Sequence, residues 1–208
     1  MAGGCHVKPR RVAALLAAPA LLLAGPAHAH LVETGFGAFY DGLAHVVMTP
    51  ADLLVVLAIA LLAGQRGVQQ TRWVLWALPV AWLAGALAGA RLPAAAVSPV
   101  LTTLTFAAAG LLVVLDAKLR PALLAVLAGI AGLIHGFVNG ATMMPGGASL
   151  LALTGAVTAV FCLLAIVAAE VTRLHAGWTR IAVRVAGSWI AAAGLLMIGW
   201  LARPLLSA

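Results

Sequence analysis

The chain has 208 residues, of which 64% are hydrophobic and only 8% are charged. Soluble globular domains carry about 25% charged residues, so this composition excludes a soluble domain and indicates an integral membrane protein. The formal net charge of +7 comes from basic residues scattered between apolar stretches. Such cations are typical of membrane-topology signals, and we expect the lipid bilayer but no nucleic acid among the partners.

Residues 1–29 have the pattern of a secretory signal peptide. A basic start, an apolar core over residues 12–24 and the sequence Ala-His-Ala at 27–29 are its three parts. We expect cleavage after Ala29, with an uncleaved anchor as the alternative. Cleavage would make His30 the first residue, whose α-amino nitrogen and imidazole can chelate Cu(II) or Ni(II). His30 is therefore a candidate metal ligand, unless it merely follows the cleavage site.

Residues 30–208 read as a single domain of six apolar spans. Crossing the hydrocarbon core of a bilayer, about 30 Å thick, takes about 20 apolar residues. Charges, prolines and glycines divide the chain into spans at 42–64, 73–90, 96–115, 121–141, 149–170 and 182–202. The predicted fold class is therefore an all-α integral membrane protein with six transmembrane helices after a cleaved signal peptide.

Basic residues are concentrated on alternate loops between these spans. The loops on one side hold Arg66, Arg72, Lys118, Arg120, Arg173, Arg180 and Arg184. The segments on the other side hold only Arg91 and Arg203. Positive charge marks the cytoplasmic side, and this assignment agrees with export of the N-terminus. We expect the protein in the bacterial inner membrane, with both termini of the mature chain in the periplasm.

Two carboxylates and an imidazole stand at the start of the first span, in the sequence GFGAFYDGLAHVVMTPAD. Asp41 and His45 are four residues apart on a segment that must lie in or on the membrane. Ionisable groups there are costly and are functional by default, so both residues are candidate metal ligands. The alternative is that Asp41 and His45 only pair with each other at the membrane interface.

Asp52 has two interpretations. On one continuous helix, Asp52 would lie on the same face as Asp41 and His45, within about 60° of rotation. Thr49-Pro50 instead favours a short helix followed by a span that begins at Pro50, because proline is best accommodated in the first turn. Thr49 would then be the N-cap, and Asp52 would satisfy free amides at the positive helix end.

The fourth span repeats part of this pattern. GLAHVV at 42–47 is echoed by GLIHGF at 132–137, and Asn139 follows His135 at a spacing of four residues. The first and fourth spans run in opposite directions, so the echo predicts two inverted three-helix halves. In such transporters the substrate site lies between the halves.

A candidate metal site follows from this arrangement. We expect His45 and His135 to face each other in the outer half of the membrane, with Asp41 as the nearest carboxylate. Asp52 and Asn139 are further candidate ligands. The alternative is that each histidine forms hydrogen bonds within the bundle and that the two never meet.

The segment GFGAFYDGLAHVVMTPADLLVVLAIALLAGQRG, with GLIHGF downstream, resembles the HupE/UreJ family of hydrogenase and urease accessory membrane proteins. This resemblance implies a nickel or cobalt permease that serves nickel enzymes. The usual motif of the family is a histidine, five residues and then Asp-His. Here His45 matches the first histidine, but Asp52 follows after six residues and Leu53 replaces the second histidine. This departure leaves open weaker metal binding, a different metal or none.

Three functions compete for this chain. The first is an inner-membrane permease for nickel or cobalt, with copper or zinc also suited to imidazole and carboxylate ligands. The second is a non-transporting accessory subunit that assembles with a membrane metalloenzyme complex or a nickel enzyme maturation system. The third is a haem-binding electron carrier with His45 and His135 as axial ligands. No nucleophile–base motif or ATP-binding motif is present, so we do not expect an enzyme.

The charge pattern makes a topology prediction. A reporter fused at Ala208 should behave as periplasmic, and one inserted in the segment 65–72 should behave as cytoplasmic. Paired alkaline phosphatase and fluorescent protein fusions measure this directly. A cytoplasmic C-terminus would contradict the predicted number of spans.

Overall fold

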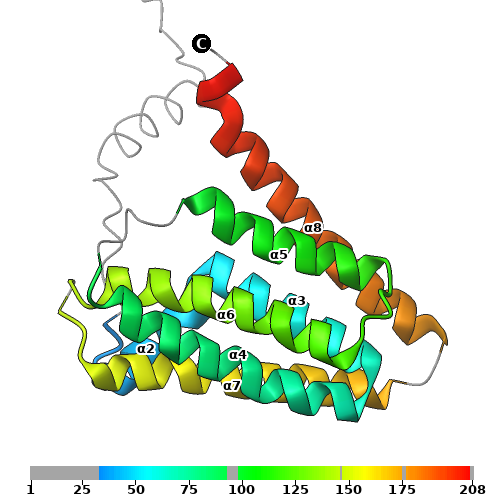
Figure 1. The fold of residues 1–208 in the computed structure, drawn as a ribbon, viewed down its shortest axis with the longest axis horizontal. Helices are drawn as coiled ribbons and strands as arrows, with labels where there is room; N and C mark the ends of the chain where they lie inside the picture. Colours follow the sequence, from blue (N-terminus) through cyan, green and yellow to red (C-terminus); the bar gives the residue numbers. More distant parts are fainter. Residues whose placement is uncertain (1–32, 93–97, 146, 175–176, 207–208) are drawn as a thin grey trace, which may run out of the picture. The chain divides into compact units, whose positions relative to one another are not determined.

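The computed structural model describes residues 33–92, 98–145, 147–174 and 177–206, which belong to one compact unit. Over these ranges every element is a helix (Figure 1). The helices are α2 (Ala38–Met48), α3 (Pro50–Arg66), α4 (Val68–Gly89), α5 (Pro99–Val114), α6 (Pro121–Met143), α7 (Leu150–Arg173) and α8 (Gly177–Leu206). The predicted signal peptide and His30 lie outside the described residues.

Helix length and hydropathy fit a membrane protein. Four helices, α4, α6, α7 and α8, are long and apolar enough to cross a bilayer, and the bent pair of α2 and α3 makes a fifth candidate span. The remaining helix, α5, is also apolar but has only 16 residues. At about 1.5 Å per residue, such a helix is shorter than the hydrocarbon core. The predicted six spans therefore correspond to six helical segments, of which up to five meet the length of a full span.

The first predicted span is broken at Thr49. Backbone dihedrals of −93° and 105° at Thr49 end α2, and Pro50 begins α3. The two helices meet at a bend of 75°. The predicted short helix and the start at Pro50 are confirmed, but the side chain of Thr49 forms no capping hydrogen bond. The carbonyl oxygen of Thr49 instead accepts the amide of Leu53 at 3.0 Å, so the backbone alone begins the helix.

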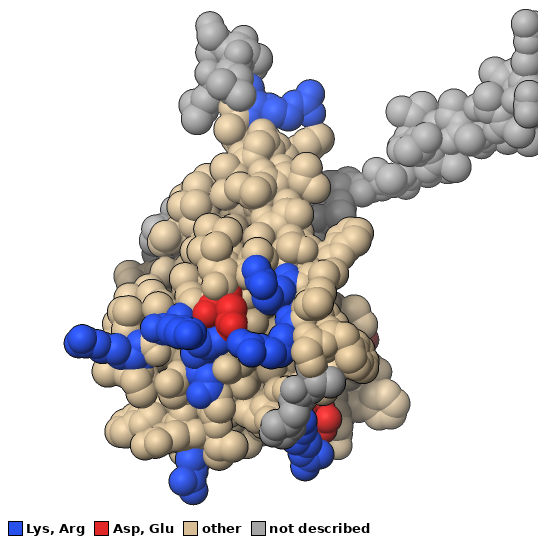
Figure 2. Space-filling model, turned by 90° about the vertical axis from the view of Figure 1, so that its right-hand side faces the viewer, with Lys and Arg blue, Asp and Glu red and all other residues tan. Residues whose placement is uncertain are grey.

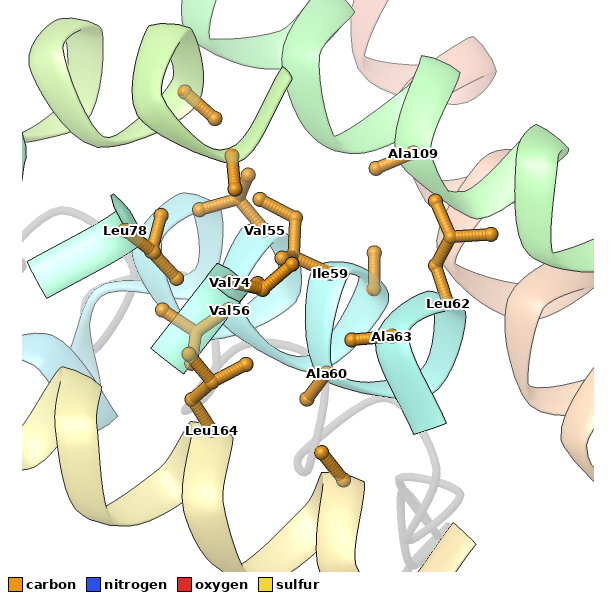
Figure 3. Packing of buried hydrophobic residues seen from close by; sticks show 14 of the residues in the cluster. Val55, Val56, Ile59, Ala60, Leu62, Ala63, Val74, Leu78, Ala109 and Leu164 are labelled. Atoms are coloured by element: carbon orange, nitrogen blue, oxygen red, sulfur yellow. The ribbon is translucent and has the colours of Figure 1, made fainter. Parts of the chain in front are cut away.

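Helix α3 is the centre of the hydrophobic core. Figure 3 shows α3 between neighbouring helices, with Leu62 directed toward Ala109 of α5 and Val56 toward Leu164 of α7. Val55 and Val56 are fully buried. Apart from Asp52 and the two polar residues at its end, α3 is apolar around its whole circumference, as expected for a helix in a protein core or a membrane span.

Glycines allow α6 to lie directly against α4. Gly132, Gly136 and Gly140 are spaced four residues apart along α6. A Cβ atom added at Gly136 or at Gly140 would overlap a backbone carbonyl of α4, that of Trp82 or of Ala86. Small residues at this spacing permit close backbone approach, which drives helix association inside membranes.

A second glycine contact joins α2 to α7. A Cβ added at Gly42 would overlap the carbonyl oxygen of Ala152, and one added at Gly155 would overlap that of Phe39. Gly42 and Gly132 are the first residues of the two echoing motifs. Each therefore packs against the second helix of the other predicted half, Gly42 against α7 and Gly132 against α4.

Because α4 and α6 are in close contact, we expect alanine substitutions at two glycines of α6 to have different effects on stability. Gly136→Ala should lower the free energy of unfolding by about 1–3 kcal/mol, because the new methyl group collides with the backbone of α4. Gly129→Ala is the matched control, since no atom lies within 4 Å of a Cβ there. The control should be neutral or slightly stabilising because alanine favours helix. Equilibrium unfolding in mixed micelles measures both; equal losses would contradict the close contact.

Candidate functional site

Three polar side chains meet in the interior of the helix bundle. Nδ1 of His135 lies 2.7 Å from one carboxylate oxygen of Asp52, and the amide nitrogen of Asn139 donates to the other oxygen at 2.7 Å. Their exposed fractions are 0% for His135, 2% for Asn139 and 3% for Asp52. Asp52 comes from the first turn of α3, and the other two residues are one turn apart on α6. We call this group the Asp52 cluster.

Two further residues hold the imidazole in place. The hydroxyl oxygen of Thr105 on α5 lies 2.8 Å from Nε2 of His135. The indole of Trp82 on α4 lies against the imidazole, with ring centroids 5.6 Å apart and planes inclined by 31°. Neither residue was predicted from the sequence. The sequence does contain a pattern that could have indicated Thr105: three threonines, at 102, 103 and 105, lie close together in an otherwise apolar span.

The hydrogen bonds determine where protons lie in the cluster. The hydroxyl of Thr105 donates to the carbonyl oxygen of Thr102 at 2.6 Å, so only its lone pairs remain for His135. Nε2 must then donate its hydrogen to Thr105. On the other side of the ring, Nδ1 and the Asp52 carboxylate share one proton, so the pair is neutral overall. A neutral pair costs much less to bury than an isolated carboxylate.

Asn139 contributes an unused acceptor. Its amide nitrogen must face the Asp52 carboxylate, which can only accept from it. Its amide oxygen is consequently directed elsewhere, and this buried atom has no hydrogen-bond partner among the described residues. Buried polar atoms without partners are rare in folded proteins and mark places where a ligand or water belongs. A carboxylate, an imidazole and an amide oxygen thus lie together in an apolar interior.

The structure separates the other predicted ligands from this cluster. The carboxylate of Asp41 accepts hydrogen bonds from the amide and hydroxyl of Thr34, at 2.6 Å and 2.7 Å. The expectation that Asp41 is the carboxylate nearest to His135 is wrong, because Asp52 is in direct contact with it. The reason is the bend at Thr49, which directs α2 away from the axis of α3.

His45 occupies an intermediate position. It lies on α2, is half-buried and is close enough to Asp52 for an electrostatic interaction. No hydrogen bond joins the rings of His45 and His135 to each other. Within the described ranges, no group of three or more His, Cys, Asp or Glu side chains is arranged to hold a metal ion. The predicted site with His45 and His135 facing each other therefore remains a prediction.

Fold and site together define a class: a polytopic helical membrane protein with one buried Asp–His–Asn cluster between α3 and α6. The sequence model of a family described as HupE / UreJ protein matches residues 17–197. The chain belongs to this HupE/UreJ family. The family is associated with nickel or cobalt transport, or with accessory roles. No curated protein and no solved structure matches the chain.

Because Asp52 is the centre of a buried cluster, its removal should destabilise the protein more than removal of Asp41. Asp52→Ala should lower the free energy of unfolding by about 3–5 kcal/mol, because His135 and Asn139 lose their common partner in a buried setting. Asp41→Ala should cost clearly less, since its two bonds to Thr34 lie at the edge of the bundle. Unfolding of the purified variants in mixed micelles measures the difference. A smaller loss for Asp52→Ala than for Asp41→Ala would contradict the structural role of the cluster.

Proposed function

We propose that the protein is an inner-membrane permease or facilitator for a divalent transition metal, with nickel or cobalt as the substrate. The observation that supports this most directly is the Asp52 cluster, which places a carboxylate and an imidazole in contact inside an apolar bundle. Ionisable side chains inside membrane helices mark substrate or ion pathways. Membership of the HupE/UreJ family favours nickel and cobalt among the metals that imidazole binds.

The cluster suits a transported ion better than a permanently bound one. A tetrahedral metal with bonds of about 2.0–2.1 Å holds two ligand atoms about 3.3 Å apart. Nδ1 of His135 and the Asp52 oxygen are 2.7 Å apart, so an ion that replaces their shared proton requires only a small separation of α3 and α6. Asn139 would supply its amide oxygen after its side-chain amide turns over, since its nitrogen faces Asp52 while the carboxylate is free of metal. A moderate number of protein ligands allows the ion to leave again, as transport requires.

His45 is proposed as an entry ligand. It precedes the break at Thr49, and Asp52 follows that break by three residues. Breaks in membrane helices are tolerated where the backbone lines a binding site. An ion held first by His45 would already lie close to the Asp52 carboxylate, because the two side chains are near enough for an electrostatic interaction.

The helix packing supports two inverted halves. If the first span is equivalent to the fourth and the second to the fifth, the contact of α4 with α6 should have a counterpart between α7 and the first span. Both contacts are present, and both are made through glycines. In this architecture the Asp52 cluster lies between the halves, since Asp52 belongs to one and His135 to the other.

The orientation in the membrane follows from the charges. We propose that the basic end of the bundle, with Arg66, Arg180 and Arg184, faces the cytoplasm. Both termini of the mature chain would then be periplasmic, after a cleaved signal peptide. Nickel delivered to the cytoplasm would supply a nickel enzyme maturation system.

An accessory subunit of a membrane metalloenzyme complex is the second candidate function. The observation that favours it is Leu53, which stands where the family motif has its second histidine. The haem alternative is disfavoured by packing. Both nitrogens of His135 are engaged and its ring lies against Trp82, so a porphyrin would have to displace several buried side chains.

Metal uptake tests the permease proposal. Cells that express Asp52→Asn, His135→Ala or His45→Ala should accumulate at least about tenfold less radioactive nickel or cobalt than wild type, as expected when a ligand is removed. Asp41→Asn is the matched control and should retain uptake, because Asp41 is bonded only to Thr34 among the described residues. Membrane levels of each variant, measured by immunoblot, separate loss of function from loss of protein.

The combination of the two histidine variants adds a second criterion. The double variant should be no worse than either single variant if both histidines act on one ion. Uptake that survives His135→Ala and Asp52→Asn would contradict the permease and favour the accessory subunit. Copurification with a metalloenzyme complex would then test that second function.

A further inference from the structure

Basic residues that are far apart in the sequence gather at one end of the bundle. Figure 2 shows this end, where several blue side chains surround a red carboxylate. The residues come from the end of α3, the turn after α5 and the start of α8. This is the end that the loop charges assign to the cytoplasm.

One carboxylate is shared by two arginines at the centre of this group. Arg66 binds one oxygen of Asp116, and Arg180 binds the other oxygen at 2.8 Å. Asp116 is held at a φ of 49°, in the left-handed region that aspartate tolerates better than most residues. The side chain of Arg66 is only 9% exposed, whereas that of Arg180 is 68% exposed.

A third arginine completes a cavity beside this pair. Nε of Arg184 donates to the carbonyl oxygen of Val114 at 2.7 Å, which fixes its guanidinium at the same end. The cavity has a volume of about 240 Å³ and is lined by all three arginines, by Asp116 and by Gln65. Pockets for drug-sized molecules measure about 300–1,000 Å³, so this one suits a smaller group.

The cavity has more positive charge and more donors than its own residues use. Three guanidinium groups face one carboxylate, which leaves two positive charges uncompensated around the cavity. Each guanidinium has five N–H donors, and the contacts above use one from each. Nε of Arg66 is buried without a hydrogen-bond partner among the described residues. A buried cation with an unused donor is costly unless a ligand supplies an acceptor.

We propose that this cavity is a binding site for a phosphate group. Guanidinium groups match phosphate oxygens in a bidentate geometry, and several arginines around one small cavity can bind a tetrahedral anion from different sides. Basic pockets at the cytoplasmic ends of membrane helices also accept anionic lipid headgroups. The phosphate belongs either to the headgroup of an anionic phospholipid or to a free phosphate in the cytoplasm. This site is separate from the Asp52 cluster and does not depend on metal transport.

Ligand-dependent stability of the full-length protein in neutral detergent tests this proposal. Unfolding temperature is followed by tryptophan fluorescence during titration with short-chain phosphatidylglycerol or with sodium phosphate. Phosphatidylcholine and sodium chloride of equal ionic strength are the respective controls. Native mass spectrometry counts bound lipid. We expect a saturable rise of the unfolding temperature with at least one of the two phosphate probes and none with the controls.

Three variants locate the binding. The double variant Arg180→Gln/Arg184→Gln and the single variant Arg184→Gln should each weaken the affinity for the effective probe by about tenfold or more, because charge-assisted hydrogen bonds are lost. Arg184→Gln is included because it leaves both Asp116 ion pairs intact and should fold normally. Arg72→Gln, at the same end but outside the cavity, is the matched control and should bind as wild type does.

Each outcome has one meaning. An effect of phosphatidylglycerol alone supports a lipid headgroup site, and an effect of inorganic phosphate supports a site for a soluble anion. Absence of any effect from both probes would overturn the proposal, and so would unchanged affinity in Arg184→Gln. Nickel uptake by the same variants is measured in parallel, so failure of this site is distinguishable from failure of the permease proposal.

Discussion

Burial of the Asp52 carboxylate is the constraint on which the rest of the bundle depends. A carboxylate that is 3% exposed among apolar helices would be very costly without partners. His135 and Asn139 satisfy both of its oxygens, and both come from α6. The polar contact therefore connects the start of α3 to the C-terminal half of α6. Any conformational change that separates these two helices has to replace those hydrogen bonds with others.

The glycine face of α6 supports this polar contact by holding α6 against α4. Because Gly136 and Gly140 lie against the backbone of α4, α6 has little freedom to rotate. The ring of Trp82, also on α4, lies against His135 and limits the imidazole to one orientation. Close packing on one side of α6 thus positions the polar groups on another. A transported ion would meet ligands that are already oriented, which reduces the cost of binding.

The basic end and the interior of the bundle differ in how their carboxylates are neutralised. At the basic end, Asp116 is bound by Arg66 and Arg180, and cations outnumber the carboxylate. In the interior, Asp52 shares one proton with His135 and the cluster is neutral. Positive charge is therefore in excess at the basic end, where lipid headgroups and water can neutralise it. In the interior, where they cannot, the charges of Asp52 and His135 balance each other. A phosphate bound at the basic end would neutralise the excess positive charge of the arginines at the end of α3 and the start of α8.

The sequence by itself determined the class of protein, the helices, the break before Pro50 and the family, and it singled out His135 as a candidate site residue. These features are local, because hydropathy, proline geometry and a short motif are read from neighbouring residues. Only the tertiary structure decided that Asp52 contacts His135 across 83 residues, that Asp41 binds Thr34 instead, and that Thr105 and Trp82 complete the site. The scattered arginines likewise converge only in space. Such contacts depend on which helix faces which, and this is set by packing and by the 75° bend at Thr49, which no local pattern specifies.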